Sequence, residues 1–173
     1  MAVLPIRIYG DPVLRKKAKE IAKPDAAVIQ LVQNMFDTLR QASGLGLSAN
    51  QVGSLQRVFI VDLSKVVPSS TPMVFINPAI LGSEGEQIGE EGCLSIPGIY
   101  EDVPRFKKVK FSALDLSGQE FVIEASDLMA RVMQHELDHL DGILFLDRLS
   151  EVVRANLAPK LKQLKPLATK GAY

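Results

Sequence analysis

One short pattern in this chain is typical of helices that hold a catalytic metal ion. His135, Glu136 and His139 form an H-E-x-x-H motif. On a helix, residues four positions apart lie on one face, so both imidazoles can reach the same ion. Glu136 is one step further round and can meet a water molecule at that ion without being a ligand itself. The alternative is a pair of surface histidines, but the motif favours a metal site.

A catalytic site of this type needs a third protein ligand and one open position. The chain has no further histidine, and Cys93 is its only cysteine. Cys93 lies in a segment bounded by Gly92 and Pro97 that follows two carboxylates, a setting that predicts a shaped loop rather than an apolar strand. The alternative is a small buried hydrophobic residue. A single cysteine cannot form an internal disulfide, so Cys93 is free to act as a ligand.

The elements that must position these residues follow from the hydrophobic pattern. Three helices are predicted: the first from apolar residues at three- and four-residue steps, the second from its closing glycine, Gly142, and the third from a segment rich in Leu and Lys. These helices run from Asp25, a suitable N-cap, to near Gly44, from Ser126 or Asp127 to Asp141, and from Ser150 onward. The third contains Pro159, which is expected to kink or divide it.

Between the first two helices the sequence predicts short strands. They run from Arg57 to Leu63, Met73 to Asn77, Lys107 to Leu116 and Glu120 to Glu124. Ser117-Gly118 is a turn signal that predicts a hairpin. Strands in the middle with helices at both ends indicate an α+β fold. We expect small antiparallel or mixed β-sheets packed around a central metal-binding helix, with an N-terminal and a C-terminal helix, in one domain spanning residues 1–173.

The composition excludes several classes of partner. Lys plus Arg and Asp plus Glu both number 20, and this balance gives no sign of sequence-specific nucleic-acid binding. No run of about 18 apolar residues predicts a membrane span, and the N-terminal apolar stretch is too short for a signal peptide. A reducing cytoplasm is the simplest compartment, and a mature organellar protein would look the same.

Three segments together resemble the three motifs of the peptide deformylase family, in the same order. They are Gly44–Gln51, Glu91–Ser95 and Gln134–Gly142. The second and third motifs are highly specific, and the resemblance covers nearly the whole chain. The family removes the formyl group from the N-terminal formylmethionine of newly synthesised polypeptides, so the resemblance implies that activity here.

The resemblance also implies a metal site. Cys93, His135 and His139 match the family's metal ligands, and Glu136 matches its catalytic carboxylate. The family's usual ion is Fe(II), with Zn, Ni or Co able to take its place. Such an ion lowers the pKa of a bound water molecule toward neutrality. Glu136 is expected to take the water's proton and deliver it to the leaving amine.

Other matching residues imply how the substrate is held. The side chain of Gln51 and the backbone N–H of Leu94 match the groups that stabilise the oxyanion. Leu45 and Gly46 match residues of the substrate cleft.

The pocket for the methionine side chain is less directly indicated. Leu128 and Val132 precede His135 by about two turns and one turn, and are candidates for its wall. Core packing is an equally good interpretation of both. Tyr100 stands where some family members carry Arg at the edge of the cleft, which makes it a candidate for outer substrate contacts.

Two charged positions depart from, or extend, the resemblance. Arg131 stands where some members have an apolar residue, and we expect it either to face solvent or to narrow the pocket. Glu91 and Arg105 are expected, from the resemblance, to form an ion pair that braces the cysteine. The alternative is two solvated charges, because exposed pairs contribute little.

Two other functions fit parts of the sequence. An endopeptidase of the H-E-x-x-H class would take a third ligand downstream, from Asp141, Asp147 or Glu151, and Cys93 argues against it. A catalytically silent formyl-peptide or metal-binding homologue would be favoured if Gln51, Cys93 or Glu136 were replaced, and all three are present.

The expected partners are N-formylmethionyl peptides, and we expect a monomer. Lys160, Lys162 and Lys165 on the last helix suggest a weak contact with the ribosome. The alternative is an ordinary solvated face, since such charge patterns are common.

Overall fold

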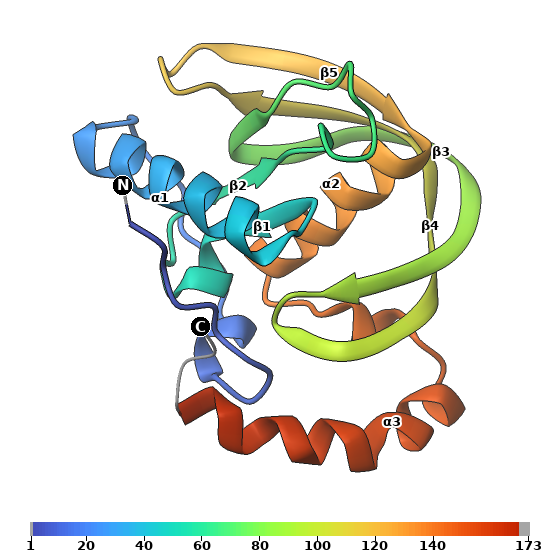
Figure 1. Ribbon diagram of the computed structural model, residues 1–173. Coiled ribbons are helices and arrows are strands. Elements are labelled where there is room, and N and C mark those ends of the chain that lie inside the picture. Colours follow the sequence, from blue (N-terminus) through green and yellow to red (C-terminus); the bar gives the residue numbers. More distant parts are fainter. Residues whose placement is uncertain (1, 170–173) are drawn as a thin grey trace.

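The computed structural model describes residues 2–169 (Figure 1). Its helices are α1 (Ala26–Ala42), α2 (Asp127–Leu140) and α3 (Glu151–Leu164). Its short 3-10 helices are η1 (Pro12–Arg15), η2 (Ala49–Val52), η3 (Phe145–Arg148) and η4 (Lys165–Thr169). Its strands are β1 (Gly46–Ser48), β2 (Val58–Val61), β3 (Met73–Cys93), β4 (Ile96–Leu114) and β5 (Glu120–Ser126).

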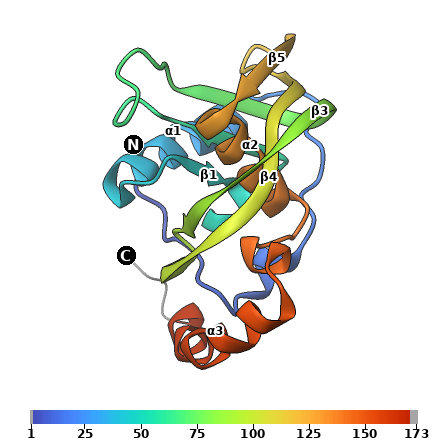
Figure 2. The same ribbon diagram turned by 90° about the vertical axis from the view of Figure 1, so that its right-hand side faces the viewer.

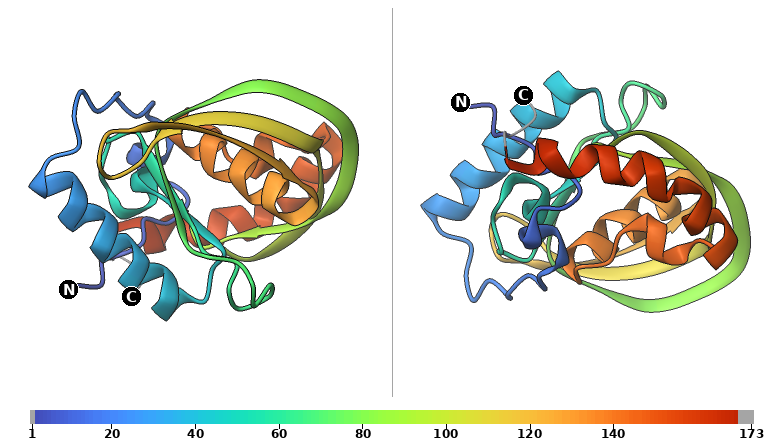
Figure 3. Two further views of the ribbon diagram at one scale, coloured as in Figure 1. Left: turned by 90° about the horizontal axis from the view of Figure 1, so that it is seen from above. Right: turned by 90° about the horizontal axis from the view of Figure 1, so that it is seen from below.

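The strands form one five-stranded sheet in the order β1-β2-β3-β4-β5, and every neighbouring pair is antiparallel. The long β3–β4 hairpin bends around α2, which lies inside its curve (Figures 1 and 3). In the side view, α3 lies at the base of the molecule, beyond the tip of that hairpin (Figure 2). The predicted α+β class, with a central helix enclosed by strands, is confirmed.

The first helix forms as the hydrophobic pattern predicts. Asp25 caps α1 by accepting a hydrogen bond from the backbone N–H of Val28 at 2.9 Å. The helix ends before Ser43, which adopts a left-handed conformation with φ 59°. Its apolar face packs against β1 and β2, and this fixes the loop that leads from α1 toward the centre of the molecule.

The middle of the chain differs from its prediction. β3 continues far beyond Asn77 to Cys93, and β4 already begins at Ile96. Cys93 is therefore the last residue of a strand, and the prediction of a shaped loop around it is wrong. Much of β3 is exposed and shows no apolar alternation. Its extended form depends instead on antiparallel pairing with β4.

The last two helices complete the framework. α2 runs from Asp127 to Leu140, as predicted, and Gly142 follows it with φ +75°. A side chain there would place Cβ 2.6 Å from the carbonyl oxygen of Arg15. Pro159 lies within α3 without dividing it; the carbonyl four residues earlier is on an exposed turn, where water can replace the missing N–H. Among residues 2–169, no helix has the length and apolar character needed to cross a membrane.

Candidate metal centre and active site

Three side chains from two elements converge beside α2. Cys93 Sγ at the end of β3 lies 3.2 Å from His139 Nε2, which lies 3.2 Å from His135 Nε2. The three ligand atoms all lie within 4.8 Å of one another. Both histidines are buried, so the interpretation as two surface histidines is wrong.

The spacing of these atoms fits a metal ion. Bonds of about 2.0–2.3 Å meeting at tetrahedral angles place ligand atoms about 3.3–3.7 Å apart, close to the distances found here. Burial lowers the pKa of His139 well below its ordinary value, which leaves its imidazole neutral, as a ligand must be. Burial also acts to lower the pKa of His135, but its contacts with Cys93 and Glu91 outweigh burial and raise it. The raised pKa means that His135 tends to hold a proton, and a bound cation would take the place of this proton.

Glu136 is buried next to the three candidate ligands. Its Oε2 atom is inaccessible to solvent and has no hydrogen-bond partner. Burial raises the pKa of Glu136 to about 7, against the opposing effect of His135. Gly46 of β1 lies against this carboxyl group, and a Cβ at residue 46 would lie 2.6 Å from Glu136 Oε1. Glycine is therefore required at residue 46 for Glu136 to keep its place.

The side-chain amide of Gln51 is fixed at both ends. Its Oε1 accepts hydrogen bonds from the backbone N–H and the hydroxyl of Ser48, at 3.0 and 3.2 Å. Its Nε2 donates to Ser95 Oγ at 3.2 Å and to Cys93 Sγ at 3.5 Å. These contacts orient the amide so that its N–H groups face the ligand cluster. Ser48 and Ser95 lie inside the recognised motifs, but residue type alone did not reveal this role.

The other imidazole nitrogen of His135 is held by Glu91, whose Oε2 lies 3.2 Å from His135 Nδ1. Arg105 donates to both oxygens of Glu91, at 2.8 and 3.0 Å, so the expected Glu91–Arg105 ion pair is confirmed. Burial alone would raise the pKa of Glu91, but hydrogen bonds from His135 and Arg105 lower it to about 2. Glu91 is thus an anion, the form that orients a ligating imidazole.

Arg131 is buried, so the expectation that it faces solvent is wrong. Its Nη1 donates to Glu91 Oε1 at 3.2 Å and to the carbonyl oxygens of Gly89 and Val103, at 3.2 and 2.9 Å. The reason is the carboxylate of Glu91, because a buried anion needs donors around it. Arg131 therefore ties α2 to β3 and β4 and also lines the cleft.

A cleft of about 450 Å³ opens beside the ligands. Its lining includes all of the residues that the sequence suggested for catalysis or substrate binding, namely Leu45, Gly46, Gln51, Leu94, Tyr100, Leu128, Val132 and Glu136. Leu128 is 38% exposed, whereas Val132 is buried and also belongs to the core. The ring of Tyr100 covers Gly92, where a Cβ would collide with the ring. Tyr100 is itself 62% exposed at the edge of the cleft.

The alternative third ligands lie elsewhere. Asp141 pairs with Arg57 at 2.8 Å, and Asp147 pairs with Arg15. Glu151 is exposed in the first turn of α3. None of these carboxylates belongs to the cluster of ligand atoms, which counts against an endopeptidase.

Comparisons with known proteins agree with this geometry. The model of the polypeptide deformylase family matches residues 3–155. A peptide deformylase from Alkalilimnicola ehrlichii is 48% identical over 164 residues, which cover 95% of this chain and 92% of the relative. One from Clostridium botulinum is 50% identical over 151 residues, which cover 87% of this chain and 99% of the relative.

Solved structures give the same result. The peptide deformylase from Thermus thermophilus superposes with a TM-score of 0.89 at 41% identity, covering 96% of this chain and 99% of the other. The peptide deformylase from Synechococcus elongatus, solved in complex with actinonin, has a TM-score of 0.87 at 38% identity, covering 95% and 90%. The chain thus belongs to the peptide deformylase family, metal-dependent hydrolases that remove the formyl group from newly synthesised polypeptides.

Proposed function

We propose that this cleft carries out the family's reaction, with one divalent ion held by Cys93, His135 and His139. The observation that supports this best is the convergence of Sγ and the two Nε2 atoms beside the unpartnered carboxylate oxygen of Glu136. Fe(II) is the proposed native ion, and the same donors also suit Zn, Ni or Co. When bound, the ion lowers the pKa of water and polarises a carbonyl oxygen.

Glu136 is proposed to move the proton. Its carboxylate takes the proton of the attacking water and then gives it to the amine that leaves the formyl carbon. A pKa of about 7 suits both steps near neutral pH, because a group that must accept and release a proton works best near the operating pH. Because Gly46 has no side chain, the carboxyl group can keep its place at the proposed ligands during both steps.

Gln51 and the backbone N–H of Leu94 are proposed to stabilise the charge that develops on the formyl oxygen. The amide of Gln51 needs little reorganisation, because Ser48 and Ser95 already orient it. Removing one such donor typically lowers the rate by about 10²–10³.

The substrate is proposed to be a peptide that begins with N-formylmethionine. Leu45, Gly46, Leu128 and Val132 line the cleft near Glu136 and would form the apolar surroundings of the methionine side chain. Tyr100, exposed at the edge, would meet the residues that follow. Because the chain shares its fold with the actinonin-bound relative, we also propose that actinonin binds this cleft.

The whole chain is proposed to act as one domain and as a monomer. A thiolate ligand is easily oxidised, which favours a reducing cytoplasm as the compartment. Lys160, Lys162 and Lys165 are exposed on and directly after α3 and are proposed as a weak ribosome contact.

The test of the proposed reaction is deformylation of formyl-Met-Ala-Ser by protein purified without oxygen. Wild type, Glu136→Ala, Cys93→Ala and Glu120→Ala are compared, with bound metal measured on each. We expect wild type and Glu120→Ala, which changes an exposed carboxylate of β5, to release formate at the same rate. Glu136→Ala keeps the ion and loses about 10²–10⁴ in rate. Cys93→Ala loses the ion.

Three results would contradict the proposal. Full activity of metal-loaded Glu136→Ala would remove Glu136 from the mechanism. Retention of the ion by Cys93→Ala would place the third ligand elsewhere, as in an endopeptidase. A metal-loaded wild type that releases no formate would identify a silent homologue.

A further inference from the structure

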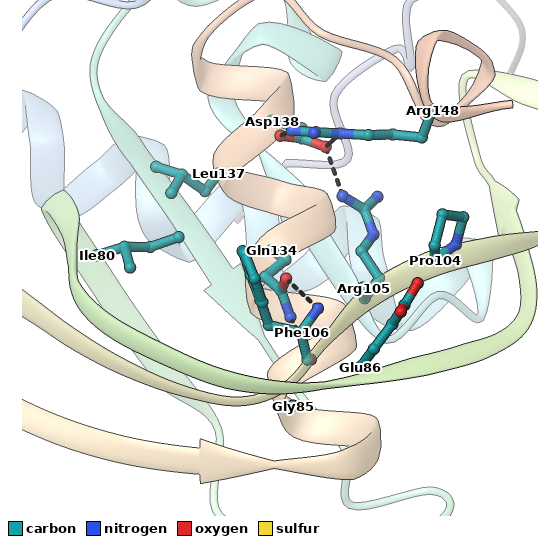
Figure 4. A pocket seen from close by; sticks show the side chains of 10 residues that line it. All are labelled: Ile80, Gly85, Glu86, Pro104, Arg105, Phe106, Gln134, Leu137, Asp138 and Arg148. Atoms are coloured by element: carbon teal, nitrogen blue, oxygen red, sulfur yellow. Dashed lines mark hydrogen bonds and ion pairs between the residues drawn. The ribbon is translucent and has the colours of Figure 1, made fainter.

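A second cavity of about 430 Å³ lies beside α2, and its wall contains charged groups that the reaction does not use (Figure 4). In Figure 4, Asp138 of α2 lies between the guanidinium groups of Arg148 from η3 and Arg105 from β4. Arg148 is the outermost of the three, because its side chain is 45% exposed whereas that of Arg105 is 3% exposed. These groups form one end of a chain that reaches the metal ligands.

The outer half of that chain is a shared carboxylate. Arg148 donates from Nε and Nη2 to the two oxygens of Asp138, at 3.0 and 2.7 Å. Arg105 donates from Nη1 to one of the same oxygens. The bidentate contact fixes the plane of the Asp138 carboxylate, and so determines the direction in which it draws Arg105.

The inner half reaches the imidazole. Arg105 uses its remaining donors, Nε and Nη2, for the two oxygens of Glu91. Glu91 in turn holds His135 Nδ1 at 3.2 Å. Arg148, Asp138, Arg105, Glu91 and His135 therefore make an unbroken series of contacts, called here the charge chain.

Burial makes the charge chain stiff. The side chains of Glu91 and Asp138 are only 4% and 10% exposed, and buried charges are strongly penalised when a partner moves away. Since Arg105 serves both carboxylates through one rigid fork, a shift of Asp138 would move the donors that Arg105 gives to Glu91. Contacts beyond the ligands orient the imidazole, and removing them typically lowers metal affinity about 10- to 100-fold.

We propose that Arg148 is a positioning residue for His135 and sets the affinity of the site for its ion through the charge chain. The proposal rests on the proposed role of His135 as a metal ligand. The effect of Arg148 is expected to pass through the charge chain and not to come from a surface ion pair, because such pairs contribute little by themselves.

The protein offers a matched control for substitutions of Arg148. Arg15 is 46% exposed and donates to both oxygens of Asp147, the residue before Arg148 in η3. Both arginines thus tie the same short helix to the body of the protein through a carboxylate. Only Arg148 is connected to Glu91 and His135, so the two substitutions separate positioning from tethering.

The experiment measures Co(II) affinity by competition with a chelator and the visible absorption spectrum of the Co(II) form. The proteins are the wild-type chain, Arg148→Met, Arg148→Lys and Arg15→Met. Arg148→Met is expected to weaken Co(II) binding about tenfold, the lower end of the usual range, and to shift the ligand-field bands. Arg148→Lys restores part of the affinity, since lysine keeps the charge but not the bidentate contact. Arg15→Met binds like wild type.

A double-mutant cycle checks the route. If the effect passes through Asp138, the double variant Arg148→Met/Asp138→Asn loses no more affinity than Asp138→Asn alone. Additive losses, equal losses in Arg148→Met and Arg15→Met, or an unchanged affinity in Arg148→Met would each overturn the proposal. Cys93→Ala is measured alongside. If it binds Co(II) as tightly as wild type, the proposed metal site itself is wrong, and the role of Arg148 is not what failed.

Discussion

The two helices α1 and α2 differ in the side chains they bury: α1 buries a mostly apolar stripe, whereas α2 also buries many charged and polar groups. The inward face of α1 is made by Val28, Val32, Met35 and Leu39, with Thr38. The buried residues of α2 include Arg131, Gln134, His135, Glu136, Asp138 and His139. Hydrophobic burial is non-directional, so α1 needs only the right volume in its core. α2 needs each donor and acceptor in place, because an unmatched buried charge is strongly destabilising.

The largest effect is expected from the removal of Arg105, which serves both Glu91 and Asp138. Arg105→Met should lower the free energy of unfolding by about 3–5 kcal/mol, because it leaves two buried carboxylates without their shared partner. It should also weaken metal binding, since Glu91 holds His135. Urea unfolding and metal content measure the two effects.

Its counterpart on α1 is Met35→Ala, at a fully buried position of the apolar face. That variant should lose about 2–5 kcal/mol through the cavity it creates, while the folded fraction keeps its ion. If Met35→Ala released the ion as readily as Arg105→Met, the two helices would not differ in the way described.

A smaller effect is expected where β1 meets α2. Gly46→Ala places a methyl group 2.6 Å from Glu136 Oε1 and must displace that carboxyl group. We expect kcat to fall by about 10², the lower range for loss of a proton-transfer group, with the ion retained. Gly82→Ala is the control, because a Cβ at residue 82 meets nothing within 4 Å. Equal kcat values for the two variants would show that Glu136 tolerates displacement.

The smallest effect concerns how each helix begins. Asp25 caps α1 with a side-chain hydrogen bond, whereas Ser126 makes none at the start of α2. Asp25→Ala should therefore cost about 1 kcal/mol of stability, and Ser126→Ala should stay within about 0.5 kcal/mol of wild type. Thermal unfolding distinguishes them. An equal loss in both would mean that α2 also depends on its cap.

Both helices could be predicted from the sequence, but for different reasons. α1 has an N-cap residue and an apolar stripe, the pattern of a helix that packs one face against a hydrophobic core. The candidate metal-binding part of α2 could be recognised because residues four apart lie on one face of a helix, whatever the rest of the fold. Cys93 could be identified as a candidate by elimination and by resemblance, without knowledge of its strand.

The full length of β3 and β4, and the charge chain beyond its Glu91–Arg105 pair, could not be predicted. Most of β3 after Asn77 is exposed and rich in Gly and Glu, so no alternation marked it as a strand, and its form depends on a partner in β4. Arg105, Arg131 and Asp138 have the residue types of ordinary surface charges. Their burial arises only when the hairpin closes over α2, which local sequence does not encode.

The position of Cys93 at the end of a strand has a thermodynamic consequence. Cys93 and His139 are 46 residues apart, and the β3–β4 hairpin must dock on α2 before their ligand atoms meet. An unfolded chain cannot assemble this cluster, so binding of the proposed ion would be linked to folding. At a free-ion concentration about 100 times the dissociation constant, the linkage adds about 2.7 kcal/mol to the stability of the native state. With the proposed ion in place, we expect a chelator to act on this protein as a mild denaturant as well as an inhibitor.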